Sequence, residues 1–150
     1  MIVKIDYKFT SLNDYIDAER TNKYIASNIK KEETEVAKLH FLGKKIRKRV
    51  HITFVWHLPN KRKDPDNVAF GKKFILDGMV KAGCLENDNL KWIASLKDEF
   101  EVDGNDFVEV LIESERDYMK LKVNCVERDN EYFYEIAPNV GTKGGEELDG

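Results

Sequence analysis

The clearest pattern of apolar and polar positions runs from residue 50 to residue 58. Apolar side chains recur there at every second position, at Val50, Ile52, Phe54, Trp56 and Leu58. Successive side chains of a β-strand point to opposite faces of a sheet, so this alternation predicts a strand. Pro59 and Asn60 follow it, and proline cannot continue a ladder of backbone hydrogen bonds.

Two longer segments repeat their apolar residues with the period of a helix. In the segment 67–82 one stripe carries Val68, Gly71, Ile75, Met79 and Ala82. Gly83 is a typical residue just past a helix end, so a single long helix is predicted from 67 to 82. The spacing in 12–41 is also mostly helical and predicts a helix broken near 30–33.

Three further segments, 2–9, 91–102 and 107–113, resemble strands, the last two joined by a turn at 103–106. Together with the strand at 50–58 they predict a sheet of about four strands. The expected fold class is therefore α+β, with the long helix following the second strand of the chain.

The chain is short enough for one domain, which we place at residues 1–115. Residues 116–150 read as a C-terminal extension. Within it, 121–126 and 131–136 have the character of a hairpin around Arg128-Asp129-Asn130. The glycine-rich, acidic segment 141–150 predicts a flexible tail.

Composition excludes several classes of protein. With 150 residues and 41% hydrophobic residues, the chain can bury a core of its own. The first residues alternate like a strand, and no apolar run approaches the ~20 residues of a membrane span. Cys84 and Cys125 lack the Cys-x-x-Cys spacing, so we expect free thiols in a reducing cytoplasm. His40, His51 and His57 also lack metal-ligand spacing, which predicts structural or surface roles.

Charge is distributed unevenly along the chain. The formal net charge is −3, but residues 40–73 hold ten Lys or Arg against two Asp, a net charge of +8. Residues 98–150 carry a net charge of −11. A basic segment of this kind predicts contacts to a phosphate backbone. We expect those contacts from Lys44, Lys45, Arg47, Lys48, Lys61, Arg62, Lys63 and Lys72.

Candidate chemistry lies in the sequence Asp64-Pro65-Asp66-Asn67. Pro65 restrains the residue before it to extended backbone, so Asp64 and Asp66 project to one side before the helix begins. Two converging carboxylates, joined by a later Asp, suit a hard cation such as Mg²⁺. The same four residues are also a good turn and helix N-cap, which is the competing interpretation.

The combined motifs resemble the RusA-type Holliday junction resolvases, small dimeric Mg²⁺-dependent endonucleases that are common in phages and prophages. The similarity covers roughly residues 48–113. It is carried by three segments: Arg62-Lys63-Asp64-Pro65-Asp66-Asn67, then Lys73 with Asp77-Gly78-Met79-Val80-Lys81-Ala82-Gly83, and finally Glu86-Asn87-Asp88.

The resemblance implies a function and the residues that perform it. It implies a crossover junction endodeoxyribonuclease that makes paired symmetric nicks in DNA recombination and repair, as a homodimer with Mg²⁺, for which Mn²⁺ can substitute. The implied metal ligands are Asp64, Asp66 and Asp88, with Lys73 assisting catalysis. The segment before Asp77 is about three residues longer than in better-known members, so Lys72 competes with Lys73 for the lysine role. Lys73 can also simply pair with Asp77, four residues away.

The expected helix poses a geometric problem, because about 16 helical residues span roughly 24 Å. Asp88 can join Asp64 and Asp66 in three ways: the chain folds back along the helix, strand pairing brings them together, or a partner subunit contributes. Rival functions also remain open. They are a branched-DNA binding module without nuclease activity, a metal-dependent phosphate-ester enzyme, and an interaction protein whose motif is only a helix cap.

Overall fold

The structure is a computed structural model that describes residues 1–123, 125–128 and 131–134. Its elements follow one another in the order β1 Ile2–Ile5, α1 Leu12–Thr21, α2 Lys23–Phe41, β2 Val50–Leu58, α3 Pro65–Ala69, α4 Lys72–Lys81, β3 Ile93–Val102, β4 Phe107–Ser114, α5 Glu115–Val123, β5 Cys125–Arg128 and β6 Glu131–Tyr134. The predicted tail at 141–150 and the end of the predicted strand at 131–136 lie outside the described residues.

Four strands form one mixed sheet in the order β1-β4-β2-β3. Strand β2 lies inside the sheet, antiparallel to β4 and parallel to β3, with Val50 opposite Ile93 and Leu58 opposite Val102. Parallel neighbours need a crossover connection, and α3 and α4 provide it. These observations confirm the predicted α+β class and the sheet of four strands.

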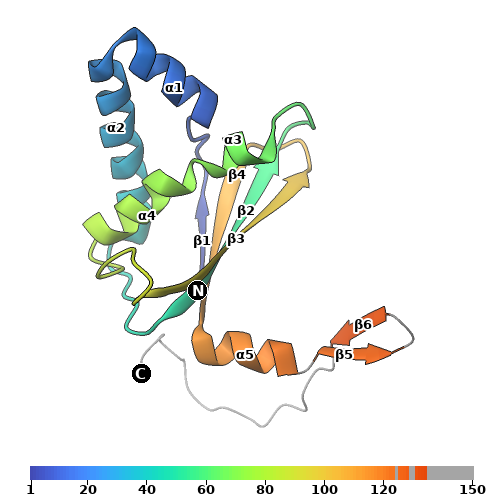
Figure 1. The fold of residues 1–150 in the computed structure, drawn as a ribbon. Helices are drawn as coiled ribbons and strands as arrows, with labels where there is room; N and C mark the ends of the chain where they lie inside the picture. The colour runs from blue at the N-terminus through green and yellow to red at the C-terminus, as the bar shows by residue number, and fades with distance from the viewer. Residues whose placement is uncertain (124, 129–130, 135–150) are drawn as a thin grey trace.

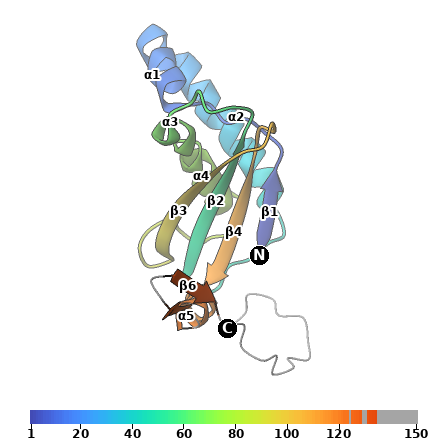
Figure 2. The ribbon, with the colours of Figure 1, turned by 90° about the vertical axis from the view of Figure 1, so that its right-hand side faces the viewer.

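Helices α1 to α4 all lie on one face of the sheet (Figures 1 and 2). The hydrophobic core fills the space between that face and the helices, and its fully buried side chains include Phe41, Phe54, Phe74, Ile75 and Met79. The alternation in β2 arises because its even-numbered side chains enter this core. Among the described residues, no helix has the length and apolar character needed to cross a bilayer.

The prediction of one long helix after the acidic motif is wrong. The segment forms two helices, α3 and α4, joined by a tighter turn in which Gly71 N donates to Val68 O and Lys73 N donates to Phe70 O. These bonds span three residues instead of four, as in a 3₁₀ turn. Gly71 also approaches the core closely, since an added Cβ would lie 2.8 Å from Phe9 Cβ.

The first helical segment is interrupted, but not at residues 30–33. The break falls at Asn22, whose extended backbone (φ −163°, ψ 119°) separates α1 from α2. Asn22 Oδ1 accepts a hydrogen bond from Tyr24 N at 2.8 Å, so the residue caps the start of α2. Helix α2 then continues through 30–33, and Glu33 and the following Thr34 are buried.

Two boundaries differ from the predicted ones near the ends of the chain. Strand β1 ends at Ile5, four residues earlier than expected. Residues 121–123 belong to α5 and not to a strand. Ser114 caps the start of this helix, because its Oγ accepts a hydrogen bond from Asp117 N at 3.3 Å and donates one to the Asp117 carboxylate at 2.8 Å. The hairpin of β5 and β6 follows, pairing Cys125 with Tyr134.

Candidate active site

The acidic motif lies where the chain leaves β2 and enters α3. Pro65 occupies the first turn of α3, and Asp64 sits before it with extended backbone (φ −75°, ψ 137°). This is the geometry expected from the restraint that proline places on the preceding residue. Asp64 and Asp66 are both exposed, so their carboxylates open to solvent at the start of the helix.

Neither carboxylate is engaged strongly by the protein. Asp64 occupies the N-cap position, yet its side chain accepts no capping hydrogen bond. Asn67 Nδ2 donates to Asp64 Oδ2 over a long 3.5 Å, and Asp66 Oδ1 accepts from the adjacent Asn67 N at 3.0 Å. Within the described residues, neither Asp forms an ion pair. The helix-cap interpretation therefore lacks the hydrogen bond on which it depends.

The two candidate lysines have different partners. Lys73 is exposed, and its Nζ lies 3.2 Å from Asp77 Oδ1 in the same helix. Lys72 is more enclosed, and its Nζ binds the carboxylate of Asp98 on β3. Asp98 also accepts a hydrogen bond of 2.9 Å from Trp56 Nε1 on β2. Lys72 is thus part of a contact that fixes α4 to the sheet, whereas Lys73 is held only by a surface pair.

Asp88 lies at the opposite end of the parallel strand pair from the acidic motif. The motif follows the end of β2, and the loop with Asp88 precedes the start of β3, which lies beside the start of β2 (Figure 1). Eight steps of about 3.3 Å separate the two ends of β2, roughly 26 Å in all. A single cation cannot bridge that distance. Within one chain, neither folding back nor strand pairing brings Asp88 to Asp64 and Asp66.

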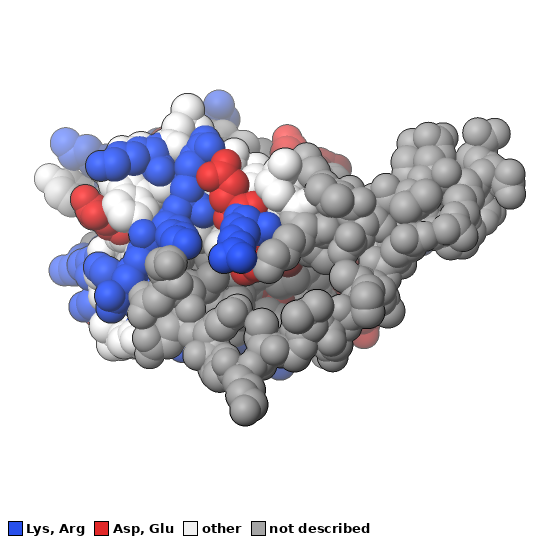
Figure 3. Space-filling view, turned by 90° about the horizontal axis from the view of Figure 1, so that it is seen from below, with Lys and Arg blue, Asp and Glu red and all other residues white. Residues whose placement is uncertain are grey.

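The first basic run is attached to the loop that carries Asp88. Lys45 Nζ donates to Gly83 O at 3.1 Å, Ile46 N donates to Cys84 O at 2.8 Å, and Arg49 Nε donates to Leu90 O at 3.0 Å. Lys45, Arg47, Lys48 and Arg49 are exposed and Lys44 is half-buried. Figure 3 shows Lys and Arg side chains gathered on this end of the molecule.

The second basic run precedes the acidic motif at the other end of the sheet. Lys61 and Arg62 are exposed. Lys63 is half-buried beside a small cavity of about 20 Å³ that Lys8, Trp56 and Asp106 also line. The pKa of Lys63 is lowered, first because burial disfavours its charge and then because it faces Lys8. Lys61 and Arg62 are therefore the freer phosphate-binding candidates of this run.

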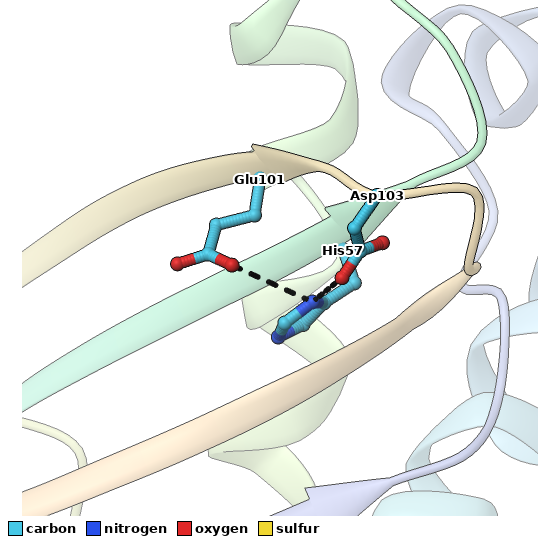
Figure 4. A group of neighbouring side chains, drawn as sticks. All are labelled: His57, Glu101 and Asp103. Carbon is cyan, nitrogen blue, oxygen red and sulfur yellow. Dashed lines mark hydrogen bonds and ion pairs between the residues drawn. The ribbon is translucent and has the colours of Figure 1, made fainter.

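A second cluster of ligand-type side chains was not predicted from the sequence. His57 Nδ1 lies 2.5 Å from Asp103 Oδ2 and 4.0 Å from Glu101 Oε2 (Figure 4). Within the described residues, these three form a group whose ligand atoms all lie within 4.8 Å of one another. Asp64, Asp66 and Asp88 do not form such a group. More than 40 residues separate His57 from its acidic neighbours, and only the β2–β3 register brings them together.

Comparison with known proteins gives no assignment. No protein-family model matches the chain, and no curated protein matches its sequence.

Proposed function

We propose that this chain is a structure-specific endonuclease that resolves four-way DNA junctions by paired symmetric nicks, acting as a Mg²⁺-dependent homodimer in recombination and repair. The observation that carries this proposal is the pair of exposed carboxylates, Asp64 and Asp66, without an ion-pair partner among the described residues. Two exposed basic residues, Lys61 and Arg62, immediately precede them. An acidic pair beside exposed cations suits metal-assisted phosphodiester hydrolysis, because the carboxylates can hold a metal ion and the cations can bind phosphates.

The donor set suits the proposed cation. Mg²⁺ takes oxygen ligands and is usually bound through one or two carboxylates, with water and substrate phosphate completing its shell. Asp64 and Asp66 supply that number of carboxylates, and Mn²⁺ accepts the same donors. Asp64 and Asp66 would hold the cation, which would supply polarisation of the scissile phosphate and a lower pKa of its bound water. Lys73 can leave its surface pair with Asp77 and offset the negative charge of the phosphate.

The third carboxylate must come from a second subunit, because Asp88 lies at the far end of its own β2–β3 pair. Strand β3 offers the surface for that subunit. No described strand pairs with its outer edge, and Leu96, Phe100 and Val102 remain 42%, 36% and 46% exposed along it. A free edge with exposed apolar side chains is a template for pairing with another chain.

Two-fold pairing of β3 with its copy explains how such a site is completed. In an antiparallel pair, the start of one strand lies beside the end of the other. The Asp88 loop of one subunit then approaches the end of the partner's β2, where the partner's Asp64 and Asp66 follow. Each composite site receives basic residues from both runs, and a two-fold axis gives two equivalent sites for two nicks.

The test is cleavage of a synthetic mobile four-way junction, beside linear duplex, by the wild type and by Asp66→Asn. Paired nicks that require Mg²⁺ and disappear in the variant, with junction affinity retained, support the proposal. Asp17→Asn is a matched control, because it removes an exposed carboxylate from α1. Junction binding without cleavage in Mg²⁺ or Mn²⁺ would instead identify a branched-DNA binding module.

A further inference from the structure

The sheet face opposite helices α1 to α4 carries the odd-numbered side chains of β2, and His57 is the buried ionisable one among them. Although it lies on this outer face, it is only 7% exposed. The ring of Phe107 stacks on the imidazole, with centroids 4.0 Å apart and planes at 14°. A histidine so enclosed on the face away from α1 to α4 has its ring orientation fixed by its neighbours.

A hydrogen bond fixes the orientation further. His57 Nε2 lies 2.6 Å from Glu109 Oε1 on β4, so this ring nitrogen donates to a carboxylate. The other nitrogen, Nδ1, therefore points toward Asp103 and Glu101 at the end of β3. Histidines that bind metals are held in this way, with one nitrogen on the ion and the other donating to a carboxylate.

We infer that His57 Nδ1, Glu101 and Asp103 form a site for a transition-metal dication, with Glu109 as the positioning carboxylate. This site goes beyond the proposed nuclease function and uses none of the residues proposed for cleavage, because it lies on the opposite face of the sheet from α3. The ion takes the place of the proton on Nδ1, and its ligands link the end of β3 to β2.

The distances are compatible with such an ion. Ligands about 2.1 Å from Zn²⁺ in a tetrahedral site lie about 3.4 Å from each other. The Nδ1 to Asp103 separation of 2.5 Å and the Nδ1 to Glu101 separation of 4.0 Å fall on either side of that value. The Glu101 side chain is 60% exposed and can swing inward, while Asp103 moves outward. Water can complete the fourth position from the open side.

The charges around His57 also favour a bound dication. Three carboxylates, Glu101, Asp103 and Glu109, surround one imidazole. Lys4, which lies opposite Glu109 in the β1–β4 register, directs its Nζ to the Phe107 ring at 4.2 Å and not to a carboxylate. The remaining negative charge suits a dication. Imidazole as a donor selects Zn²⁺, or another transition metal of similar softness, over Mg²⁺.

Zn²⁺ titration of metal-free full-length protein by calorimetry tests the site. All proteins carry Asp66→Asn, which weakens any competing binding by the acidic motif and separates this test from the nuclease. We expect one Zn²⁺ per chain, with affinity reduced at least tenfold by Glu101→Gln and by Asp103→Asn. Removal of the positioning carboxylate by Glu109→Gln should reduce affinity by roughly 10- to 100-fold. Glu113→Gln removes a charge from the same face outside the site and should have no effect.

Glu101 is exposed, so Glu101→Gln should fold normally even if another variant does not. Equal Zn²⁺ affinity in Glu101→Gln and in the Glu113→Gln control would overturn the proposal. Failure of the parent protein to bind Zn²⁺ at millimolar concentration would also overturn it.

Discussion

Gly78 of α4 lies so close to Ala37 of α2 that a Cβ at Gly78 would come within 2.5 Å of the Ala37 Cβ. The backbone of α2 is almost as near, at 2.7 Å from Lys38 N and 2.9 Å from Thr34 O. This close approach of the two helices fixes the position of α4, the helix that carries Lys73.

Gly78→Ala should consequently destabilise the protein, although alanine favours a helix by about 1 kcal/mol over glycine. Overpacking of this kind costs about 1–3 kcal/mol, and urea denaturation should show a net loss of stability. The double variant Gly78→Ala/Ala37→Gly should recover only part of that loss, because the contacts with the α2 backbone remain. Greater stability of Gly78→Ala than of wild type would contradict the packing described.

Complementation between inactive subunits tests whether the proposed nuclease site is shared. Asp66→Asn and Asp88→Asn should each be inactive alone. Their mixed dimer should nick junctions, because one of its two sites combines the intact Asp66 of one subunit with the intact Asp88 of the other. Mixing Asp64→Asn with Asp66→Asn is the control and should restore nothing, since both residues come from the same segment. Failure of the first mixture, with mixed dimers shown to form, would exclude a shared site.

Substitution of the two neighbouring lysines of α4 should affect different properties, stability for Lys72 and junction cleavage for Lys73. Lys72→Met leaves the partly buried Asp98 carboxylate without its cation, which should cost about 1–3 kcal/mol in unfolding free energy. Lys73→Met breaks an exposed pair and should change stability by less than about 0.5 kcal/mol. If Lys73 assists catalysis, its variant should lose junction cleavage while its melting temperature is unchanged. Lost cleavage in Lys72→Met alone, at full stability, would reverse the assignment.

Glu33 should make stability depend on pH. The pKa of its carboxyl is raised, chiefly by burial, although hydrogen bonds from Thr10 and Tyr7 act in the opposite direction. The folded state therefore holds this proton more tightly than the unfolded state. The contribution to stability is present below pH ~4.5 and is lost as the pH rises through the folded value.

Glu33→Gln removes this titration while its amide oxygen still accepts from Thr10 N. Its stability relative to wild type should therefore rise between pH 4.5 and pH 8, as measured by denaturation at each pH. Glu32→Gln, at the exposed neighbouring position, should show a much smaller change. A constant difference between Glu33→Gln and wild type across this range would contradict the prediction.

Sequence analysis predicted the sheet better than the helices. The alternation in β2 identified a strand reliably, because one face of that strand enters the core and the other does not. Helix boundaries depended on single residues whose roles are tertiary or conformational. Asn22 adopts an extended conformation between two helical segments, and Gly71 packs against Phe9.

In the candidate site, too, the features that depend on local sequence were predicted and those that depend on tertiary structure were not. Local sequence predicted the extended backbone of Asp64 before α3, because Pro65 restrains only its immediate neighbours. The separation of Asp88 depends on the β2–β3 register, and so does the meeting of His57 with Asp103. Spacing along the chain contains no information about that register.

Strand β1 joins the sheet through residues more than 100 positions away, since Ile2 pairs with Leu111 and Ile5 with Val108. Helices α1 and α2 can form from local contacts, but the sheet that they cover cannot be completed until β4 has been synthesised. High contact order of this kind slows folding. The apolar face of α2 therefore emerges from the ribosome well before its final partners, and the nascent chain is most exposed to aggregation or chaperone binding in that interval.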